Sequence, residues 1–237
     1  MAVGAGLNLL VDIDVSPVLN AILIDGGSLI FPSVDDDPTH HRQFDANIIY
    51  VQNGYIEAGT EEEPYRSKLT ITMHGKKYDP YVPTYGNKCI GVRWATIDIH
   101  GIPRTPTWTS LETTATAGSN TITLIEPVDW QVGEEIIIAS TDFDRSHAEK
   151  KTITAVGGTT AKPTLTLDSA LSHKHYAAID YYGNDGDFIE IRAEVGLLTR
   201  NVVYRGDPET SPLNKYGAHI MVHSPGDETS VGRIEYA

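Results

Sequence analysis

The sequence of 237 residues is short of cysteine, having only Cys89, so no disulfide bond can form within the chain. A single cysteine in an apolar strand usually behaves as a small buried hydrophobic residue. The sequence also lacks an Asn-X-Ser/Thr site and any apolar stretch long enough to span a bilayer. We therefore expect no N-glycosylation and no membrane insertion by this segment.

Basic residues are also scarce, with 18 lysines and arginines against 32 aspartates and glutamates, which gives a formal net charge of -14. An acidic surface repels nucleic acid and anionic membranes, so neither is expected as a partner. The sequence has no nucleophile elbow, phosphate-binding loop, HExxH motif or CxxC pair. Composition and short motifs therefore leave the function open.

Helical periodicity is nearly absent, and strand-like segments recur roughly every 8 to 12 residues between glycine-containing turns. This spacing indicates an all-β chain of the sandwich, barrel or solenoid type. Units that begin near Ile22, Ile49 and Ile90 share one plan of apolar strand, glycine turn and second strand. Asn53-Gly54 predicts a tight turn, because both residues tolerate positive φ. The repetition favours a β-solenoid, in which each coil contacts only its neighbours.

Two similar strand ends, ITMHG at 71–75 and IDIHG at 97–101, extend this repeat. Strand alternation places the apolar residues of each on one face and His74, Asp98 and His100 on the other. In neighbouring coils the two histidines would lie about 5 Å apart, and with Asp98 they would form a metal site or an acid–base pair. The alternative is that each histidine bonds a loop at its own strand end.

Several longer segments resemble a known family. DVSPVLNAILIDGGSLIF, YIEAGTEEEPYRSKLTITMHG, YGNKCIGV and IDIHGIPRTPTWTSL resemble the glycine-rich extracellular G8 domain. VDWQVGEEIIIASTDFDRSHAEKKTI, RAEVGLLTRNVVYRGD and YGAHIMV resemble the β-helical segment that follows this domain. The chain is thereby similar to the fibrocystin-L branch of the family, and also to the branch of the transmembrane protein two and cell-migration-inducing hyaluronidases.

The resemblance implies a G8 domain over residues 1–112, followed by the first coils of a right-handed parallel β-helix over residues 113–237. It implies an extracellular or cell-surface location and, for the hyaluronidase branch, calcium-dependent cleavage of hyaluronan. Calcium is the only cofactor that the resemblance suggests. Family members have a further opening segment and many more coils, so we expect this sequence to be a piece of a longer chain.

The richest polar cluster lies in an expected loop at residues 141–150. An enzyme that cleaves an acidic sugar needs a positive group for the uronate and a carboxylate or histidine for proton transfer. A loop is also where functional residues tend to gather. The alternative is a solvated insertion between coils. The candidate catalytic residues are Asp142, Asp144, Arg145, His147 and Glu149, and the candidate ligand-binding cations are Arg145, Lys150 and Lys151.

Other expected loops also have candidate binding residues. Tyr81, Tyr85 and Trp108 are placed to stack on sugar rings, although aromatic residues in proline-rich loops also pack against their own scaffold. The acidic stretch at 35–41 offers carboxylates to calcium, but it lacks the spacing and the glycine of a known calcium loop. A solvated loop is the simpler interpretation of that stretch.

The sequence therefore predicts an extracellular binding or structural module that presents loops on a β-solenoid to a glycan or protein ligand. The main alternative is a hyaluronidase-like glycosidase that uses the loop at 141–150. A third is a subunit of an extracellular filament or coat, which would self-associate through the open ends of the β-helix because unpaired strand edges attract further strands.

Overall fold

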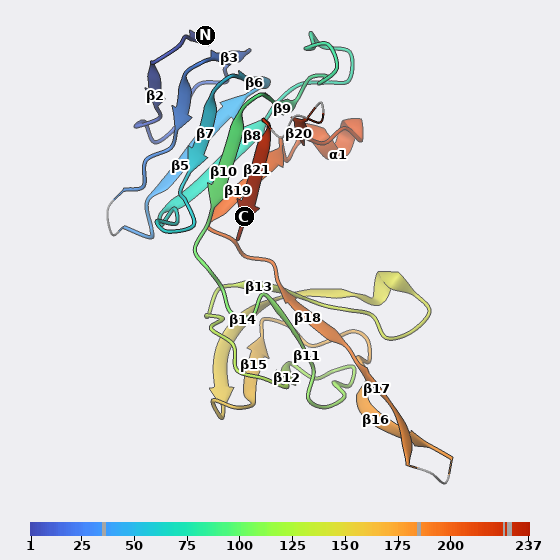
Figure 1. The fold of residues 1–237 in the computed structure, drawn as a ribbon. Coiled ribbons are helices and arrows are strands. Elements are labelled where there is room, and N and C mark those ends of the chain that lie inside the picture. Colours follow the sequence, from blue (N-terminus) through green and yellow to red (C-terminus); the bar gives the residue numbers. More distant parts are fainter. Residues whose placement is uncertain (35–36, 184–185, 225, 227–228) are drawn as a thin grey trace. The chain divides into compact units, whose positions relative to one another are not determined.

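The chain is all-β, as the sequence predicts, and its strands form two compact units (Figure 1). The computed structural model describes residues 1–34, 37–183, 186–224, 226 and 229–237. The first unit contains Met1–Pro103 and Arg200–Ala237, and the second contains Arg104–Thr199. Each unit has a hydrophobic core of its own.

Three sheets of parallel strands build the first unit. The first sheet has the order β1-β3-β6-β9-β20 and consists of Ala2–Val3, Ile22–Asp25, Ile48–Gln52, Cys89–Arg93 and His219–His223. The second has the order β2-β4-β7-β10-β21 and consists of Asn8–Leu10, Ser28–Ile30, Tyr55–Ala58, Thr96–His100 and Val231–Glu235. The third has the order β19-β8-β5 and consists of Val202–Gly206, Lys68–Met73 and His41–Ala46.

The chain visits these sheets in a fixed order, since β3, β4 and β5 lie in the first, second and third sheet and β6, β7 and β8 repeat the path. Each coil turns from the first sheet to the second at a corner that contains a residue with positive φ. These residues are Gly26 (φ 77°), Asn53 (φ 52°) and Trp94 (φ 48°), and the corners stack on one another. The Gly26 N–H donates to the Gln52 carbonyl at 3.0 Å, and the Asn53 N–H donates to the Arg93 carbonyl at 3.2 Å. Asn53 therefore forms the tight turn that the sequence predicts.

Strand alternation predicts the inner face of this unit. Ile71, Met73, Ile97 and Ile99 are all buried in its core. His100, expected on the outer face, is also only 3% exposed, because neighbouring strands and loops cover it. The outer surface is therefore less open than alternation alone suggests.

The second unit is inserted in the chain between β10 and β19, and its strands pair antiparallel. Residues 113–199 consequently differ from the parallel coils expected there. The physical reason is the short connections, such as the one from Gly158 to Pro163, which reverse the chain onto the adjacent strand. One sheet has the order β11-β18-β13-β14-β15-β12 and consists of Trp108–Ser110, Glu194–Leu197, Glu135–Ile138, Glu149–Gly158, Pro163–Leu167 and Thr121–Thr123.

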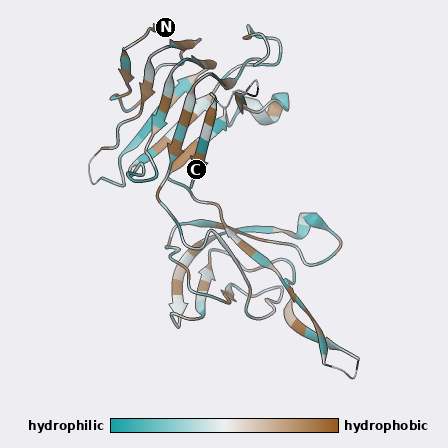
Figure 2. Cartoon of the chain, in the orientation of Figure 1, coloured by the Kyte–Doolittle hydropathy of each residue, from teal (hydrophilic) through white to brown (hydrophobic). Residues whose placement is uncertain are grey.

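The remaining elements of the second unit are the 3-10 helix η1 (Arg145–His147) and a two-stranded hairpin of β16 (Ala177–Tyr182) and β17 (Asp187–Arg192). Hydrophobic residues follow the strands of both units (Figure 2). The one α-helix in the described part of the chain, α1 (Thr210–Asn214), belongs to the first unit. Within the described residues, no helix has the length and apolar character needed to cross a membrane.

Candidate functional site

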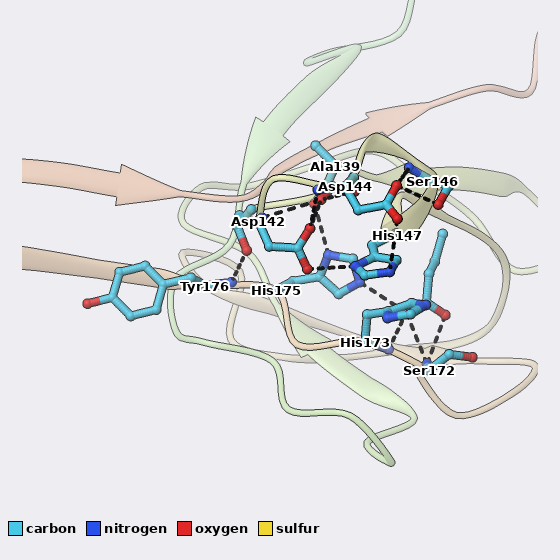
Figure 3. Close-up of polar contacts among 12 residues, drawn as sticks. Ala139, Asp142, Asp144, Ser146, His147, Ser172, His173, His175 and Tyr176 are labelled. Atoms are coloured by element: carbon cyan, nitrogen blue, oxygen red, sulfur yellow. Dashed lines mark hydrogen bonds and ion pairs between the residues drawn. The ribbon is translucent and has the colours of Figure 1, made fainter.

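The loop between β13 and β14 folds around the carboxylate of Asp142 (Figure 3). Asp142 Oδ1 accepts hydrogen bonds from Ser140 Oγ at 3.0 Å and from the Asp144 N–H at 2.8 Å. Asp144 in turn caps η1 by accepting from the Ser146 N–H at 2.8 Å. Aspartate side chains commonly satisfy backbone donors close to them in sequence. These local bonds fix the polar loop in one conformation at the protein surface.

His147 links this loop to a second segment of the chain. Its Nδ1 lies 2.6 Å from Asp142 Oδ2, and its Nε2 lies 3.6 Å from Asp144 Oδ2. The hydrogen bond between His147 and Asp142 raises the pKa of His147 and lowers the pKa of Asp142 to about 2. The imidazole also stacks on His173, with ring centroids 3.8 Å apart and 13° between the ring planes. His147 is therefore a protonatable group held between two carboxylates and a second imidazole.

Glu149 begins β14 and is almost fully buried. Its oxygens accept the backbone N–H of Ser172, at 2.9 and 3.0 Å, and that of His173, at 2.8 Å. Lys151 Nζ and His175 Nε2 each lie 3.2 Å from this carboxylate. Burial raises the pKa of Glu149, but the surrounding donors outweigh burial and bring the pKa down to about 2. Glu149 is consequently an anion at neutral pH, held by groups inside the unit.

The cations expected to bind a uronate do not gather at one place. Lys151 is buried, and its Nζ donates to Ser169 Oγ at 3.1 Å and to the Ala170 carbonyl at 2.9 Å. Lys150 Nζ lies 2.6 Å from Glu135 Oε1 on the adjacent strand. Arg145 is exposed on η1. Arg145 and Lys150 are both exposed, and Arg145 is the one that lies within the loop between β13 and β14.

Sequence reasoning passed over the two histidines that complete this network. His175 is fully buried, and its Nδ1 donates to the Ala139 carbonyl at 2.8 Å. His173 supplies both a ring for His147 and a backbone N–H for Glu149. The only signal was the run HKH at 173–175, which gives no indication that it lies against residues 139–149. The structure therefore joins Asp142, His147 and Glu149 through a segment far along the chain.

The three aromatic candidates have different environments. Tyr81 is 70% exposed and Trp108 is 60% exposed, so both present apolar rings to solvent. Tyr85 is buried, its ring lies 5.0 Å from that of Tyr50, and its hydroxyl lies 3.1 Å from His223 Nδ1. Tyr85 is therefore part of the packing of the first unit, and the expectation that it faces a ligand is wrong because long-range contacts cover it.

The predicted pairing of His74 with His100 is wrong. β8 pairs with β5 and β19 in the third sheet, whereas β10 pairs with β7 and β21 in the second, so the two strands are not neighbours. His74 Nε2 lies 2.6 Å from Asp45 Oδ1, and its Nδ1 lies 3.2 Å from Asp207 Oδ2. The two strand ends look alike in sequence because each closes a strand of its own sheet.

Asp98 and His100 belong to a separate network. Arg233 binds both oxygens of Asp98, at 2.6 and 2.8 Å, and the Tyr55 hydroxyl donates to Oδ2 at 2.6 Å. Burial raises the pKa of Asp98, but the hydrogen bonds from Arg233 and Tyr55 leave that pKa below its ordinary value. His100 Nε2 lies 3.4 Å from the same carboxylate. Asp98 on β10 therefore bonds to both neighbouring strands of the second sheet, to β21 through Arg233 and to β7 through Tyr55.

The acidic stretch at 35–41 is described only in part, because Asp35 and Asp36 lie outside the described residues. Asp37 Oδ1 accepts from the Thr39 N–H at 2.9 Å and from the Thr39 hydroxyl at 2.6 Å, which is a local turn. Across the residues that the structure describes, no group of three or more His, Cys, Asp or Glu side chains is placed to hold a metal ion.

Comparison with known proteins agrees with the predicted family. Residues 1–112 match the family model of the G8 domain. The first 112 residues belong to the G8 domain family. Homology extends beyond this G8 domain: the chain is 36% identical to mouse fibrocystin-L over 254 residues and 34% identical to human fibrocystin-L over the same length. Each alignment covers 93% of this chain and 6% of the relative.

A more distant relative has the same domain. A G8 domain-containing protein of Dictyostelium discoideum is 29% identical over 219 residues, which cover 87% of this chain and 14% of that protein. The chain thus spans a small part of the length of its relatives. Because the alignments to fibrocystin-L cover 93% of this chain, the similarity extends into both units. The predicted similarity to the two hyaluronidases stays a prediction.

Proposed function

We propose that this chain is an extracellular binding and structural module of a fibrocystin-L-like surface protein, and that it presents loops on a β-solenoid to a glycan or protein ligand. Homology to fibrocystin-L over 93% of the chain supports this role. The three parallel sheets, visited in a repeating order, support a right-handed parallel β-helix for the first unit. A solenoid accommodates a large insertion because each coil contacts only its neighbours.

The observation that carries the proposal is the way the Asp142–Glu149 segment is built. Glycoside hydrolysis needs a carboxylic acid that is protonated near the working pH, usually through a raised pKa. Asp142 and Glu149 each have a pKa of about 2, and the oxygens of Glu149 are occupied by donors from the protein itself. Neither carboxyl group therefore has the raised pKa of a general acid, and both are held as anions in fixed positions, which suits recognition of a ligand.

Hyaluronan degradation gives a direct test. The chain is incubated with fluorescently labelled hyaluronan, with and without calcium, and the length of the labelled polymer is followed by size-exclusion chromatography. We expect the polymer to keep its length under both conditions. Release of small fragments by the wild-type chain, but not by Asp142→Asn or His147→Ala, would overturn the binding role in favour of a glycosidase. Glu209→Gln serves as a control with the same loss of charge at an exposed position of the first unit.

The location is tested separately. Cells that express the full-length protein are treated with a biotinylation reagent that does not cross membranes. We expect the segment that corresponds to this chain to be labelled on intact cells. Labelling only after the cells are opened would contradict an extracellular role.

A further inference from the structure

A pocket of about 620 Å³ opens on the second unit around Trp108, and we refer to it as the Trp108 pocket. Trp108 lies opposite Gly196, and Ser110 lies opposite Glu194, in the pairing of β11 with β18. Directly opposed residues of antiparallel strands share one face of the sheet. Because Gly196 has no side chain, nothing from that position covers the indole, which is 60% exposed.

The pocket is acidic. Its charged lining residues are three carboxylates, Glu126, Glu190 and Glu194, and one guanidinium, Arg192. Arg192 is already engaged, since its Nε lies 2.5 Å from Glu190 Oε1 and its Nη1 donates to the carbonyl of Leu111 at 3.0 Å. An aromatic face beside carboxylates attracts a cation, through the ring quadrupole and through charge. The same charges repel an acidic sugar.

An apolar strip adjoins the pocket on the β16–β17 hairpin. Ile179 lies opposite Glu190, and Tyr181 lies opposite Phe188, so these side chains share the face that contains Glu190. Ile179, Tyr181 and Phe188 are 40%, 71% and 59% exposed. Figure 2 shows hydrophobic residues on both strands of this hairpin. Exposed aromatic and aliphatic residues beside a polar pocket are typical of a surface that binds another protein.

We propose that the Trp108 pocket and the adjoining strip on the hairpin bind a partner protein, with an arginine side chain of the partner in the pocket. The guanidinium lies over the indole of Trp108 and faces the carboxylates of Glu126 and Glu194. Apolar residues that flank this arginine pack on Ile179, Tyr181 and Phe188. The inference goes beyond the proposed function, because it assigns a ligand class to a surface separate from the Asp142 loop.

The test uses a pair of probes that differ in charge and little in shape. N-acetyl-arginine methylamide and its uncharged citrulline analogue are titrated into the whole chain of 237 residues labelled with ¹⁵N. Binding is followed through the amide shifts of Ser110 and Gly196, which line or adjoin the pocket. We expect saturable shifts with the arginine probe and an affinity at least about tenfold lower for citrulline, since cation–π and charge attraction are lost.

Variants locate the binding. Trp108→Ala should abolish the shifts and Trp108→Phe should weaken binding several-fold, while Glu194→Gln should also weaken it. Glu209→Gln removes one charge from the first unit and should leave the affinity unchanged. Phe188→Ser should not alter binding of the small probe, but should weaken binding of the longer probe acetyl-Leu-Arg-Leu-amide.

Three results would overturn the proposal. They are the absence of shifts with the arginine probe at millimolar concentration, equal affinity for the citrulline probe, and binding of a hyaluronan tetrasaccharide in the same pocket. The last result would identify a glycan site. None of them changes the expected result of the hyaluronan degradation test, so the two proposals fail independently.

Discussion

The imidazole of His147 lies flat against that of His173, with ring centroids 3.8 Å apart. This contact joins the loop between β13 and β14 to the segment before β16 (Figure 3). The backbone N–H of His173 donates to Glu149, so a surface carboxylate, two imidazoles and a buried carboxylate form one connected network. A change of charge at Asp142 should therefore change the environment of the His147 imidazole and of the His173 ring stacked on it.

The first prediction concerns the titration of His147. Its pKa is raised chiefly by the hydrogen bond to Asp142, so Asp142→Asn should lower that pKa towards the ordinary value. A raised pKa means that the protonated ring contributes stability at low pH, and that this contribution is lost as the pH rises through the folded-state pKa. Titration of the His147 ring protons by NMR measures both values. Superimposable curves for wild type and Asp142→Asn would show that the bond is absent in solution.

The second prediction is that Glu149→Gln destabilises the second unit. The glutamine keeps the shape but leaves the buried Lys151 without its anion, and breaking such a pair typically costs about 3 kcal/mol. Native-state hydrogen exchange of the amides in β13 and β14 measures the change in this unit alone. Glu209→Gln, an exposed change, should stay within about 0.5 kcal/mol of wild type. Equal exchange rates in the two variants would mean that Glu149 is not a structural anion.

The third prediction is that the second unit loses stability as the pH is lowered. The pKa of Glu149 falls from an ordinary 4.5 to about 2 in the folded state. As the pH is lowered, Glu149 is therefore protonated in the unfolded state at a higher pH than in the folded state. The carboxylate therefore contributes stability above pH 4.5, and this contribution is lost as the pH falls towards 2. The loss attributable to this group is roughly 3 kcal/mol. Urea unfolding at several pH values measures it, and the slope in this window should be shallower for Glu149→Gln than for wild type.

Local patterns in the sequence were enough to predict that the fold is all-β and to predict part of the candidate site. The turn at Asn53 and the buried face of β10 follow from residues that are adjacent or two apart. The surroundings of the Asp142 carboxylate are similarly local, since the hydrogen bonds of Asp142 itself reach no further than His147. These features are decided within a few residues, where turn propensity and strand alternation act.

The remaining features depend on contacts between distant parts of the chain. β19 pairs with β8 although the whole second unit lies between them, and no local pattern signals that a coil continues after such an insertion. Tyr85 is covered by Tyr50 and His223, which are far from it in sequence. His173 reaches His147 in the same way. Alternation and composition describe neighbours along the chain, so they could not predict these contacts.

The fourth prediction tests the stacking of the coils in the first unit. A Cβ added at Gly54 would lie 2.4 Å from the carbonyl oxygen of Gly27 in the adjacent coil, an atom fixed by its hydrogen bond from the Tyr55 N–H. Gly54→Ala should therefore force the two corners apart and lower the free energy of unfolding by roughly 1–3 kcal/mol. Hydrogen exchange of the amides in β3 and β6 measures the effect next to the substitution.

The matched control for this substitution is Gly217→Ala, in the same unit, where an added Cβ meets nothing within 4 Å and the backbone is not left-handed. The control should leave exchange in β3 and β6 unchanged. If Gly54→Ala behaved like this control, the corners at Gly27 and Gly54 would not be in close contact. The register of β4 on β7, which places Ser28 beside Tyr55 immediately after these corners, would then have to differ from the one described.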